Sequence, residues 1–210
     1  MSVSHIVTKP LSIAGITLEP LAEAHRDGLK DAGDDPLIWR YLPYDIFTGG
    51  YEKGFNHWFD ATLALEQTHA EAIWAVRLIS DGSIVGTTRY LNIAAQDKRV
   101  EIGGTWYAPD VWAGKVNPAC KFLLMQYGFE TLNLNRIELK TDARNDRSQA
   151  AIARLGATRE GVFRRHMVLP DGHIRDTVYF SVIAEEWPFV KDGLMARLAT
   201  FETACERSDI

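Results

Sequence analysis

The sequence contains little cysteine and no long apolar run. Its 210 residues include two cysteines, Cys120 and Cys205, too few for a disulfide framework, and no Cys/His cluster has zinc-ligand spacing. No apolar stretch reaches the roughly 18 residues that a membrane helix needs. The N-terminus lacks the basic start and long apolar segment of a signal peptide. These absences predict a reduced, cytoplasmic protein with no membrane partner and no metal site.

An excess of positive charge is also missing. Twenty-three Lys and Arg residues against 28 Asp and Glu give a net charge of −5, which makes nucleic acid and anionic lipid poor candidate partners. The charge is unevenly spread, however, with a net −4 over residues 1–60 and +3 over 135–176. This gradient has two open interpretations: chance scatter, or a molecule that meets a cation on one side and an anion on the other.

No linker divides the chain. Pro/Gly/Ser-rich stretches, internal repeats and low-complexity tracts are all missing, so we predict one domain over residues 10–188, followed by an amphipathic helical tail over 189–210. The tail carries an apolar stripe that packs either on its own domain or on a second copy of the chain, and the sequence leaves both open. The stripe consists of Phe189, Leu194, Leu198 and Phe201.

The hydrophobic periodicity predicts an α/β fold. A meander of strands comes first and is followed by strands that alternate with helices, which implies a mixed sheet with helices on both faces. Strands are expected over 16–21, 71–79, 83–92, 98–107, 136–140, 161–169 and 173–184. Helices are expected over 22–32, 51–67, 118–132, 145–155 and 185–205, with an aromatic-rich loop over 34–50.

Residues 111–121 predict a helix start that can bind an anion. Asn117 is a favoured N-cap and Pro118 is favoured at the first helical position. A short loop with Gly114 and Lys115 precedes them, so free backbone N–H groups and the positive end of the helix dipole converge there. Most capped helix starts bind nothing, so this segment taken alone favours a purely structural role.

Residues 145–156 predict a second capped helix. If Asn145 is the N-cap, Ser148 occupies the third helical position, and both side chains are expected to face the same cleft mouth. Gly156 is suited to the C-terminal cap. A capped surface helix with no further role is the alternative interpretation.

Together these segments resemble the GNAT superfamily of N-acetyltransferases, specifically its RimJ/RimL-like branch. The resemblance covers roughly residues 10–195 and rests on 101–106, 112–121, 145–151, 155–157 and 160–164, extended by 175–177 and 186–188. It implies a mixed central sheet that is splayed at the acetyl-CoA site. It also implies transfer of an acetyl group from acetyl-CoA to a primary amine, by direct attack in a ternary complex and without a metal.

The resemblance also implies a cofactor site. Strand residues 103–107 would hold the pantetheine arm through their backbone, the loop 112–117 would receive the pyrophosphate, and Ser148 would lie near the thioester sulfur. The expected cofactor-binding residues are Gly104, Thr105, Trp106, Trp112, Gly114, Lys115, Val116, Asn117, Asn145 and Ser148.

The phosphate loop departs from the family pattern at two positions. Ala113 and Lys115 stand where the family usually has glycine, which allows backbone to approach phosphate closely and often has a positive φ. Ala113 costs little unless its φ is positive, and Lys115 adds a cation, so we expect cofactor binding to survive with altered geometry. Lys115, Arg144 and Arg147 lie near this site in the sequence, which gives the charge gradient a candidate cause.

Acetyl transfer needs a base for the ammonium, a donor for the departing thiolate and a polarised carbonyl. Glu101, at the start of the strand 98–107, is the first candidate base, and His166 is the second. Alternatively, Glu101 is a surface carboxylate and His166 a packed histidine, neither with a catalytic role. Ser148 is the candidate donor to the thiolate, and backbone N–H groups of 104–107 would stabilise the oxyanion.

The resemblance implies that the acceptor side is formed by the loop after the first helix and by the hairpin 165–174. Trp39, Tyr41, Tyr44 and Asp45 would form an aromatic and acidic lip suited to a cationic amine. Alternatively, the aromatic residues only pin the loop to the core. A protein N-terminus and a small-molecule amine both remain open as acceptors, and the branch allows a homodimer. A non-catalytic acyl-CoA-binding module on the same fold is the alternative function.

Overall fold

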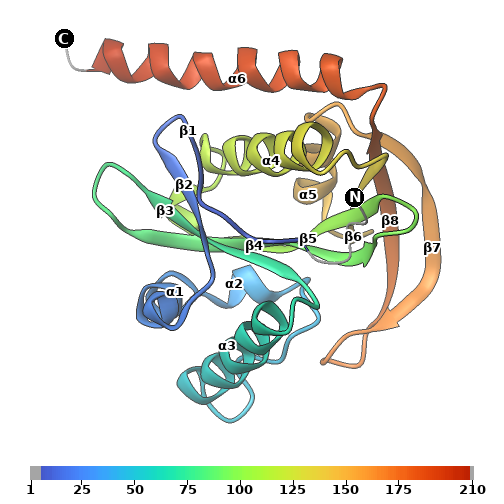
Figure 1. Ribbon diagram of the computed structural model, residues 1–210. Helices are drawn as coiled ribbons and strands as arrows, with labels where there is room; N and C mark the ends of the chain where they lie inside the picture. The colour runs from blue at the N-terminus through green and yellow to red at the C-terminus, as the bar shows by residue number, and fades with distance from the viewer. Residues whose placement is uncertain (1–5, 209–210) are drawn as a thin grey trace.

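An eight-stranded mixed sheet forms the centre of the molecule (Figure 1). The computed structural model describes residues 6–208, with side chains described through Phe201. The strand order is β1-β2-β3-β4-β5-β6-β8-β7, and every neighbouring pair is antiparallel except β5 and β6. The strands are β1 (Leu11–Ile13), β2 (Ile16–Pro20), β3 (Ala72–Leu78), β4 (Ile84–Ala94), β5 (Arg99–Tyr107), β6 (Arg136–Asp142), β7 (Thr158–Val168) and β8 (Ile174–Ile183).

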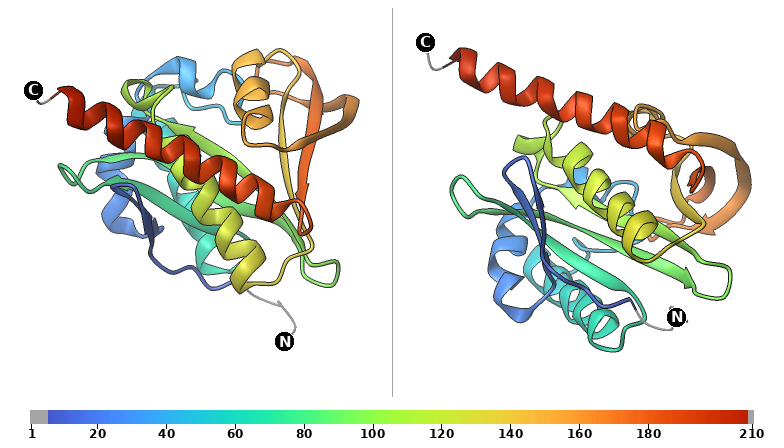
Figure 2. Two further views of the ribbon diagram at one scale, coloured as in Figure 1. Left: turned by 90° about the horizontal axis from the view of Figure 1, so that it is seen from above. Right: turned by 45° about the horizontal axis from the view of Figure 1, so that its top comes forward.

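Helices cover both faces of the sheet, as the α/β prediction requires. The first three lie on one face and the last three on the other (Figures 1 and 2). They are α1 (Arg26–Ala32), α2 (Pro36–Trp39), α3 (Tyr51–Gln67), α4 (Val116–Gln126), α5 (Asp146–Ala153) and α6 (Trp187–Ser208). Short 3₁₀ turns occupy Glu23–His25 and Pro109–Val111, and a π-helical turn occupies Tyr127–Thr131. Among the described residues, none of the helices combines the length and apolarity needed to cross a bilayer.

The sheet opens in its middle, between β5 and β6. These parallel strands are paired only at Arg99–Arg136, Val100–Ile137 and Glu101–Glu138. Beyond them β5 continues to Tyr107 beside β4, while β6 continues to Asp142 beside β8. The second half of each strand therefore has no partner across the gap, which confirms the predicted splay.

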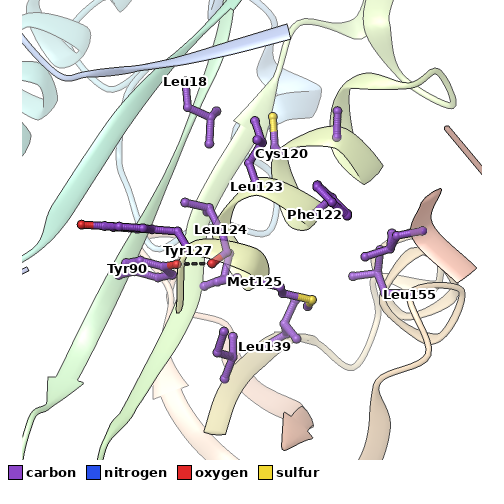
Figure 3. Packing of buried hydrophobic residues seen from close by; sticks show 14 of the residues in the cluster. Leu18, Tyr90, Cys120, Phe122, Leu123, Leu124, Met125, Tyr127, Leu139 and Leu155 are labelled. Carbon is purple, nitrogen blue, oxygen red and sulfur yellow. Dashed lines mark hydrogen bonds between the residues drawn. The ribbon is translucent and has the colours of Figure 1, made fainter. Parts of the chain in front are cut away.

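Two hydrophobic clusters hold the helices to the sheet. On one face, the apolar side of α4 packs on the strands, and the Tyr90 hydroxyl donates a hydrogen bond to the Leu124 carbonyl (Figure 3). On the other face, α2 and α3 pack on β3 and β5 through an aromatic cluster built around Trp39, Trp58 and Trp106. Burial of this apolar area is the main favourable contribution to folding.

The C-terminal helix α6 packs against α4, so most of the predicted stripe covers its own domain. Leu194 and Leu198 are buried in the main core, whereas Phe189 is 81% exposed and points away from it. Phe201 is half-buried. The domain boundary at residue 188 and the homodimer stay predictions. Cys120 is buried and unpaired, and the side chain of Cys205 lies outside the described part of the chain.

The start of α4 differs from the prediction. The helix begins at Val116 with Lys115 at the N-cap, and no side chain caps it, so Asn117 is not the N-cap. Asn117 and Pro118 occupy the second and third helical positions, where the missing N–H of proline still costs no intrahelical hydrogen bond. Strand β1 and helix α2 were not predicted, because elements of three and four residues show too little periodicity.

Candidate active site

A cavity of about 490 Å³ occupies the splay. Its lining includes residues of α2 from one face of the sheet and of α4, α5 and α6 from the other, with β5 and β6 between them (Figure 1). The cavity therefore reaches both faces of the sheet at the one place where two neighbouring strands separate.

Most of the predicted cofactor residues line this cavity. They are Gly104, Thr105, Trp106, Trp112, Gly114, Asn117, Asn145 and Ser148. Val116 is buried in the core instead, and Lys115 turns toward the β1–β2 connection. The Lys115 Nζ would lie 3.3 Å from a Cβ built on Gly15, in the β1–β2 connection. Lys115 is not part of the cavity lining.

Strand β5 carries a bulge where it faces the cavity. Gly103 pairs with Arg89 and Trp106 with Thr87, so β5 has one residue more than β4 between these pairs. Gly104 has a φ of +54°, and a Cβ there would lie 2.6 Å from the Nε of Arg89. Glycine is therefore required at 104. Because β6 no longer pairs with the other edge of β5 here, this stretch of β5 has an unpaired strand edge that is open to a ligand.

The loop before α4 has a strained backbone. Ala113 has a φ of +61°, the condition under which alanine in place of glycine carries a cost, about 1 kcal/mol or slightly more. The Trp112 indole donates to the Tyr107 carbonyl at 2.8 Å, which fixes the loop. The Arg147 guanidinium lies 3.7 Å from the centre of the Trp112 ring and joins α5 to this loop.

The start of α5 agrees with the prediction. The Asn145 Oδ1 accepts a hydrogen bond from the Ser148 backbone N–H at 3.0 Å, so Asn145 is the N-cap and Ser148 the third helical residue. Both residues line the cavity. The Ser148 hydroxyl makes no hydrogen bond to any described residue and is available to a ligand.

The cavity wall is strongly basic. Its charged residues are Lys121, Lys140, Arg147, Arg154, Arg175 and Arg197, against the single carboxylate of Asp142. Hydrogen bonds from Arg144 outweigh the opposing effect of burial and hold the pKa of Asp142 below its usual value, so Asp142 is ionised and paired. Four of the six cations come from the basic segment 135–176, which supports the interpretation that this segment meets an anion.

Two further observations bear on whether an anionic cofactor fits. The Nη1 of Arg197 is buried and has no hydrogen-bond partner among the described residues. The backbone N–H groups at the start of α4 have no side-chain cap, and Asn117 and Pro118 place this helix end on the cavity. Both leave donors unsatisfied, which suits a ligand that carries phosphate groups.

Glu101 lies beside the cavity rather than in its lining. Its carboxylate is buried, is 2.9 Å from the Lys140 Nζ and accepts from the Asn92 side chain at 2.8 Å. Lys140 lines the cavity, as does Lys121, whose Nζ donates to the Thr105 hydroxyl at 3.0 Å. Burial lowers the pKa of Lys121 to about 8. A buried charged network thus lies at the base of the splay, which alternation along one strand could not reveal.

His166 lies on β7 and lines a separate surface depression with Phe163, Arg164, Arg165 and Asp176. Its Nδ1 is 3.1 Å from the Thr177 hydroxyl, and burial lowers its pKa. The structure therefore places the second candidate base outside the cavity. In residues 6–208, no group of three His, Cys, Asp or Glu side chains is arranged to hold a metal ion.

On the acceptor loop, only Tyr41 of the predicted residues lines the cavity, together with Leu37, Ile38 and Leu42. The Trp39 indole is buried and donates to the Gly33 carbonyl at 2.8 Å, and Tyr44 packs edge-on against it. Asp45 accepts the Thr48 backbone N–H at 3.1 Å and closes a turn. Trp39, Tyr44 and Asp45 thus lie outside the cavity lining. For Trp39 and Tyr44 this agrees with the alternative interpretation, in which the aromatic residues hold the loop against the core.

Comparison with known sequences gives one matching family. The profile of the acetyltransferase (GNAT) domain matches residues 16–158. A curated relative, the "Putative ribosomal N-acetyltransferase YdaF" of Bacillus subtilis (strain 168), is 33% identical over 111 residues. That alignment covers 52% of this chain and only 59% of the relative's length.

Solved structures share the fold. A GCN5-related N-acetyltransferase from Brucella melitensis superposes with a TM-score of 0.82 at 28% identity, covering 92% of this chain and 87% of its own. Mycobacterium smegmatis RimJ in complex with CoA-disulfide superposes with a TM-score of 0.75 at 23% identity, covering 90% and 93%. At that identity the second likeness concerns the fold alone.

Proposed function

The chain belongs to the acetyltransferase (GNAT) family, and from this premise we propose that it transfers an acetyl group from acetyl-CoA to a primary amine. The observation that carries the proposal is the basic cavity in the splay between β5 and β6. A donor that enters from the side of α4 and α5 and an amine that enters from the side of α2 would meet beside β5.

The residues of the cavity wall suit acetyl-CoA. When bound, it supplies an acetyl group activated as a thioester and a tail that carries phosphate groups. The unpaired edge of β5 near Gly104 would hydrogen-bond the pantetheine arm, and the uncapped start of α4 would receive phosphate.

The chain's own groups would then serve the chemistry. The Ser148 hydroxyl, held by the Asn145 cap, would donate a proton or a hydrogen bond to the departing sulfur. Backbone N–H groups of 104–107 would polarise the carbonyl. We propose that Glu101 removes the amine proton through water, because its carboxylate pairs with Lys140 and lies outside the cavity lining. His166 is the second proposal for the base.

The acceptor would approach the apolar wall formed by Leu37, Ile38, Tyr41 and Leu42. A protein N-terminus is the acceptor that the name of the B. subtilis relative favours, and a small-molecule amine is the other candidate.

A non-catalytic acyl-CoA-binding module is the second candidate function. The observation that favours it is the positive φ of Ala113, because it strains the loop that would receive the pyrophosphate. The two candidates differ in chemistry, since only an enzyme releases thiol from acetyl-CoA.

Thiol release from acetyl-CoA across a panel of amines and N-terminal peptides tests the choice. An enzyme releases thiol with at least one amine, and Ser148→Ala lowers that rate about tenfold or more. Ser80→Ala, at an exposed loop serine, is the matched control and keeps the rate. Cofactor binding without release on any amine would favour the binding module.

Separate Glu101→Gln and His166→Gln variants, followed as rate against pH, test the base. The base variant loses about tenfold or more and its pH profile changes shape. If both variants keep the rate, water alone takes the proton and neither residue is the base.

A further inference from the structure

The C-terminal helix α6 contributes a side chain to the cavity. Arg197 lies in the middle of α6 and lines the cavity together with Arg154, which lies at the end of α5. Leu194 and Leu198, its neighbours on α6, are buried in the main core, so the helix is fixed in place. Arg197 lies outside the residues 16–158 that the family profile matches.

Arg197 has an unsatisfied hydrogen-bond donor within the described part of the chain. Its Nη1 is buried and has no hydrogen-bond partner among the described residues. Burial and, to a lesser extent, the positive charge of Arg154 lower its pKa. A buried guanidinium N–H without an acceptor is costly, and such groups in folded proteins usually have a protein, water or ligand partner.

Arg154 does not supply that partner and also lacks a counter-charge. Its Nε donates to the Ala150 carbonyl at 3.1 Å, and neither arginine pairs with a carboxylate in the described part of the chain. Lys140, by contrast, pairs with Glu101 in the same wall. Two cations that line one cavity without a paired carboxylate repel each other, and an anion would remove both the repulsion and the unsatisfied donor.

We propose that Arg154 and Arg197 form an anion subsite that binds a phosphate group of the acyl-CoA, so that α6 is part of the cofactor site. The inference rests on the proposed function, because it takes the acyl-CoA as the ligand of the cavity. Phosphate suits this pair, since a guanidinium presents several N–H donors in a plane and binds its oxygens at two points. Coenzyme A offers phosphate at its pyrophosphate and at its ribose 3′ position.

Calorimetric titration of the full chain with CoA and with 3′-dephospho-CoA, over a series of salt concentrations, tests the proposal. Arg197→Gln removes the charge but keeps a polar side chain of similar reach. We expect it to weaken CoA binding about tenfold and to reduce the salt dependence of the dissociation constant. Arg197→Lys, which keeps the charge, recovers part of the loss.

The two ligands distinguish the two phosphates. If the subsite binds the 3′-phosphate, Arg197→Gln weakens CoA and leaves 3′-dephospho-CoA unchanged. If it binds the pyrophosphate, both ligands weaken by the same factor. Either result supports the proposal, and hydrogen exchange then slows in α6 on CoA binding to the wild type but less in the variant.

Lys191→Gln is the matched control. It removes one positive charge from the same helix, but the Nζ of Lys191 pairs with Glu130 and lies outside the cavity lining. We expect its CoA affinity to equal that of the wild type. The proposal is overturned if Arg197→Gln binds CoA like the wild type, or weakens it with an unchanged salt dependence. Absence of CoA binding by the wild type would instead reject the proposed function, and this subsite with it.

Discussion

The two sides of the cavity differ in side-chain type, with cationic side chains on one and aromatic side chains on the other. On the side of α4, α5 and α6 the wall carries cations whose long side chains reach the cavity from three helices. On the side of α2 and α3, aromatic rings pack on one another, with Trp39 5.2 Å from both Trp58 and Trp106 between ring centres. Of the buried aromatic residues in this cluster, only Trp106 also lines the cavity. The basic side therefore presents its charges to the cavity, whereas most of the aromatic surface is buried in the core.

The largest effect is expected from removing a ring on the aromatic side, which tests whether these rings stabilise the fold. Trp39→Ala leaves a large hole among Trp58 and Trp106 and removes the indole hydrogen bond to the Gly33 carbonyl, which keeps the one from the Asp35 N–H. We expect it to lower the free energy of unfolding by about 3–5 kcal/mol. Leu37→Ala, at a side chain that is 55% exposed, is the control and changes it by less than about 0.5 kcal/mol. Urea titration measures both. A small effect of Trp39→Ala would mean that this ring is held for a ligand.

On the basic side, Lys121 makes stability depend on pH. Because burial lowers its pKa to about 8, the folded state releases this proton at a lower pH than the unfolded state, and wild-type stability rises between about pH 8 and 10.5. Below pH 8 the buried charge is a constant cost. Lys121→Met therefore stabilises the protein at pH 7, by about 1–3 kcal/mol, and this advantage shrinks as the pH rises to 10.5.

Thermal unfolding of Lys121→Met at several pH values measures this difference. Lys53→Met, at an exposed position of α3, is the matched control and should show no such pH dependence. A variant that is destabilised equally at pH 7 and pH 10 would show that Lys121 is satisfied by its hydrogen bond to Thr105.

Arg147 tests the basic side without touching the core. Arg147→Gln removes a cation that stacks on Trp112, so we expect cofactor affinity to fall about three- to tenfold and most strongly at low salt. The free energy of unfolding should change by less than about 0.5 kcal/mol. Arg99→Gln, at a half-buried arginine outside the cavity, is the control for a general charge effect. Equal losses in the two variants would assign the effect to net charge alone.

The smallest expected effect concerns the loop backbone. Ala113→Gly relieves the positive φ of Ala113, and we expect a gain in unfolding free energy of about 0.5–1 kcal/mol after the entropy cost of glycine. Ala14 has a φ of +50° in the β1–β2 turn, away from the cavity, so Ala14→Gly is a control with the same strain. Both should gain stability, but only Ala113→Gly should change cofactor affinity. A stability loss in Ala113→Gly would show that the loop is not strained.

Local periodicity predicted the long elements well. The expected helix 51–67 has the bounds of α3, and the Asn145 cap on α5 is present. The splay followed from the family resemblance, because no local pattern records that two strands separate. The N-cap of α4 was misplaced because Asn117-Pro118 also fits inside the first turn.

The sequence predicted the parts of the candidate site that lie on local backbone motifs. It did not predict the parts where side chains from distant segments come together. Gly104 and Ser148, which the family resemblance assigned to the cofactor site, line the cavity. Lys121, Arg154 and Arg197 come from three helices and meet only through tertiary packing, and a lone arginine on an amphipathic helix carries no local signal. The prediction for the aromatic loop failed for a different reason. Its sequence is the same whether Trp39 and Tyr44 contact a ligand or pack on one another, as they do here.

The three-pair contact between β5 and β6 also bears on how the chain reaches its native state. The strands β1 to β5 pair in chain order, and β6, β8 and β7 pair among themselves along most of their length. The junction between these two half-sheets closes the crossover through α4 but gains backbone hydrogen bonds at only three residue pairs, so it offsets little of the entropy lost on ordering. We therefore expect the two half-sheets to join late, so that the ligand cavity is among the last parts of the molecule to take shape.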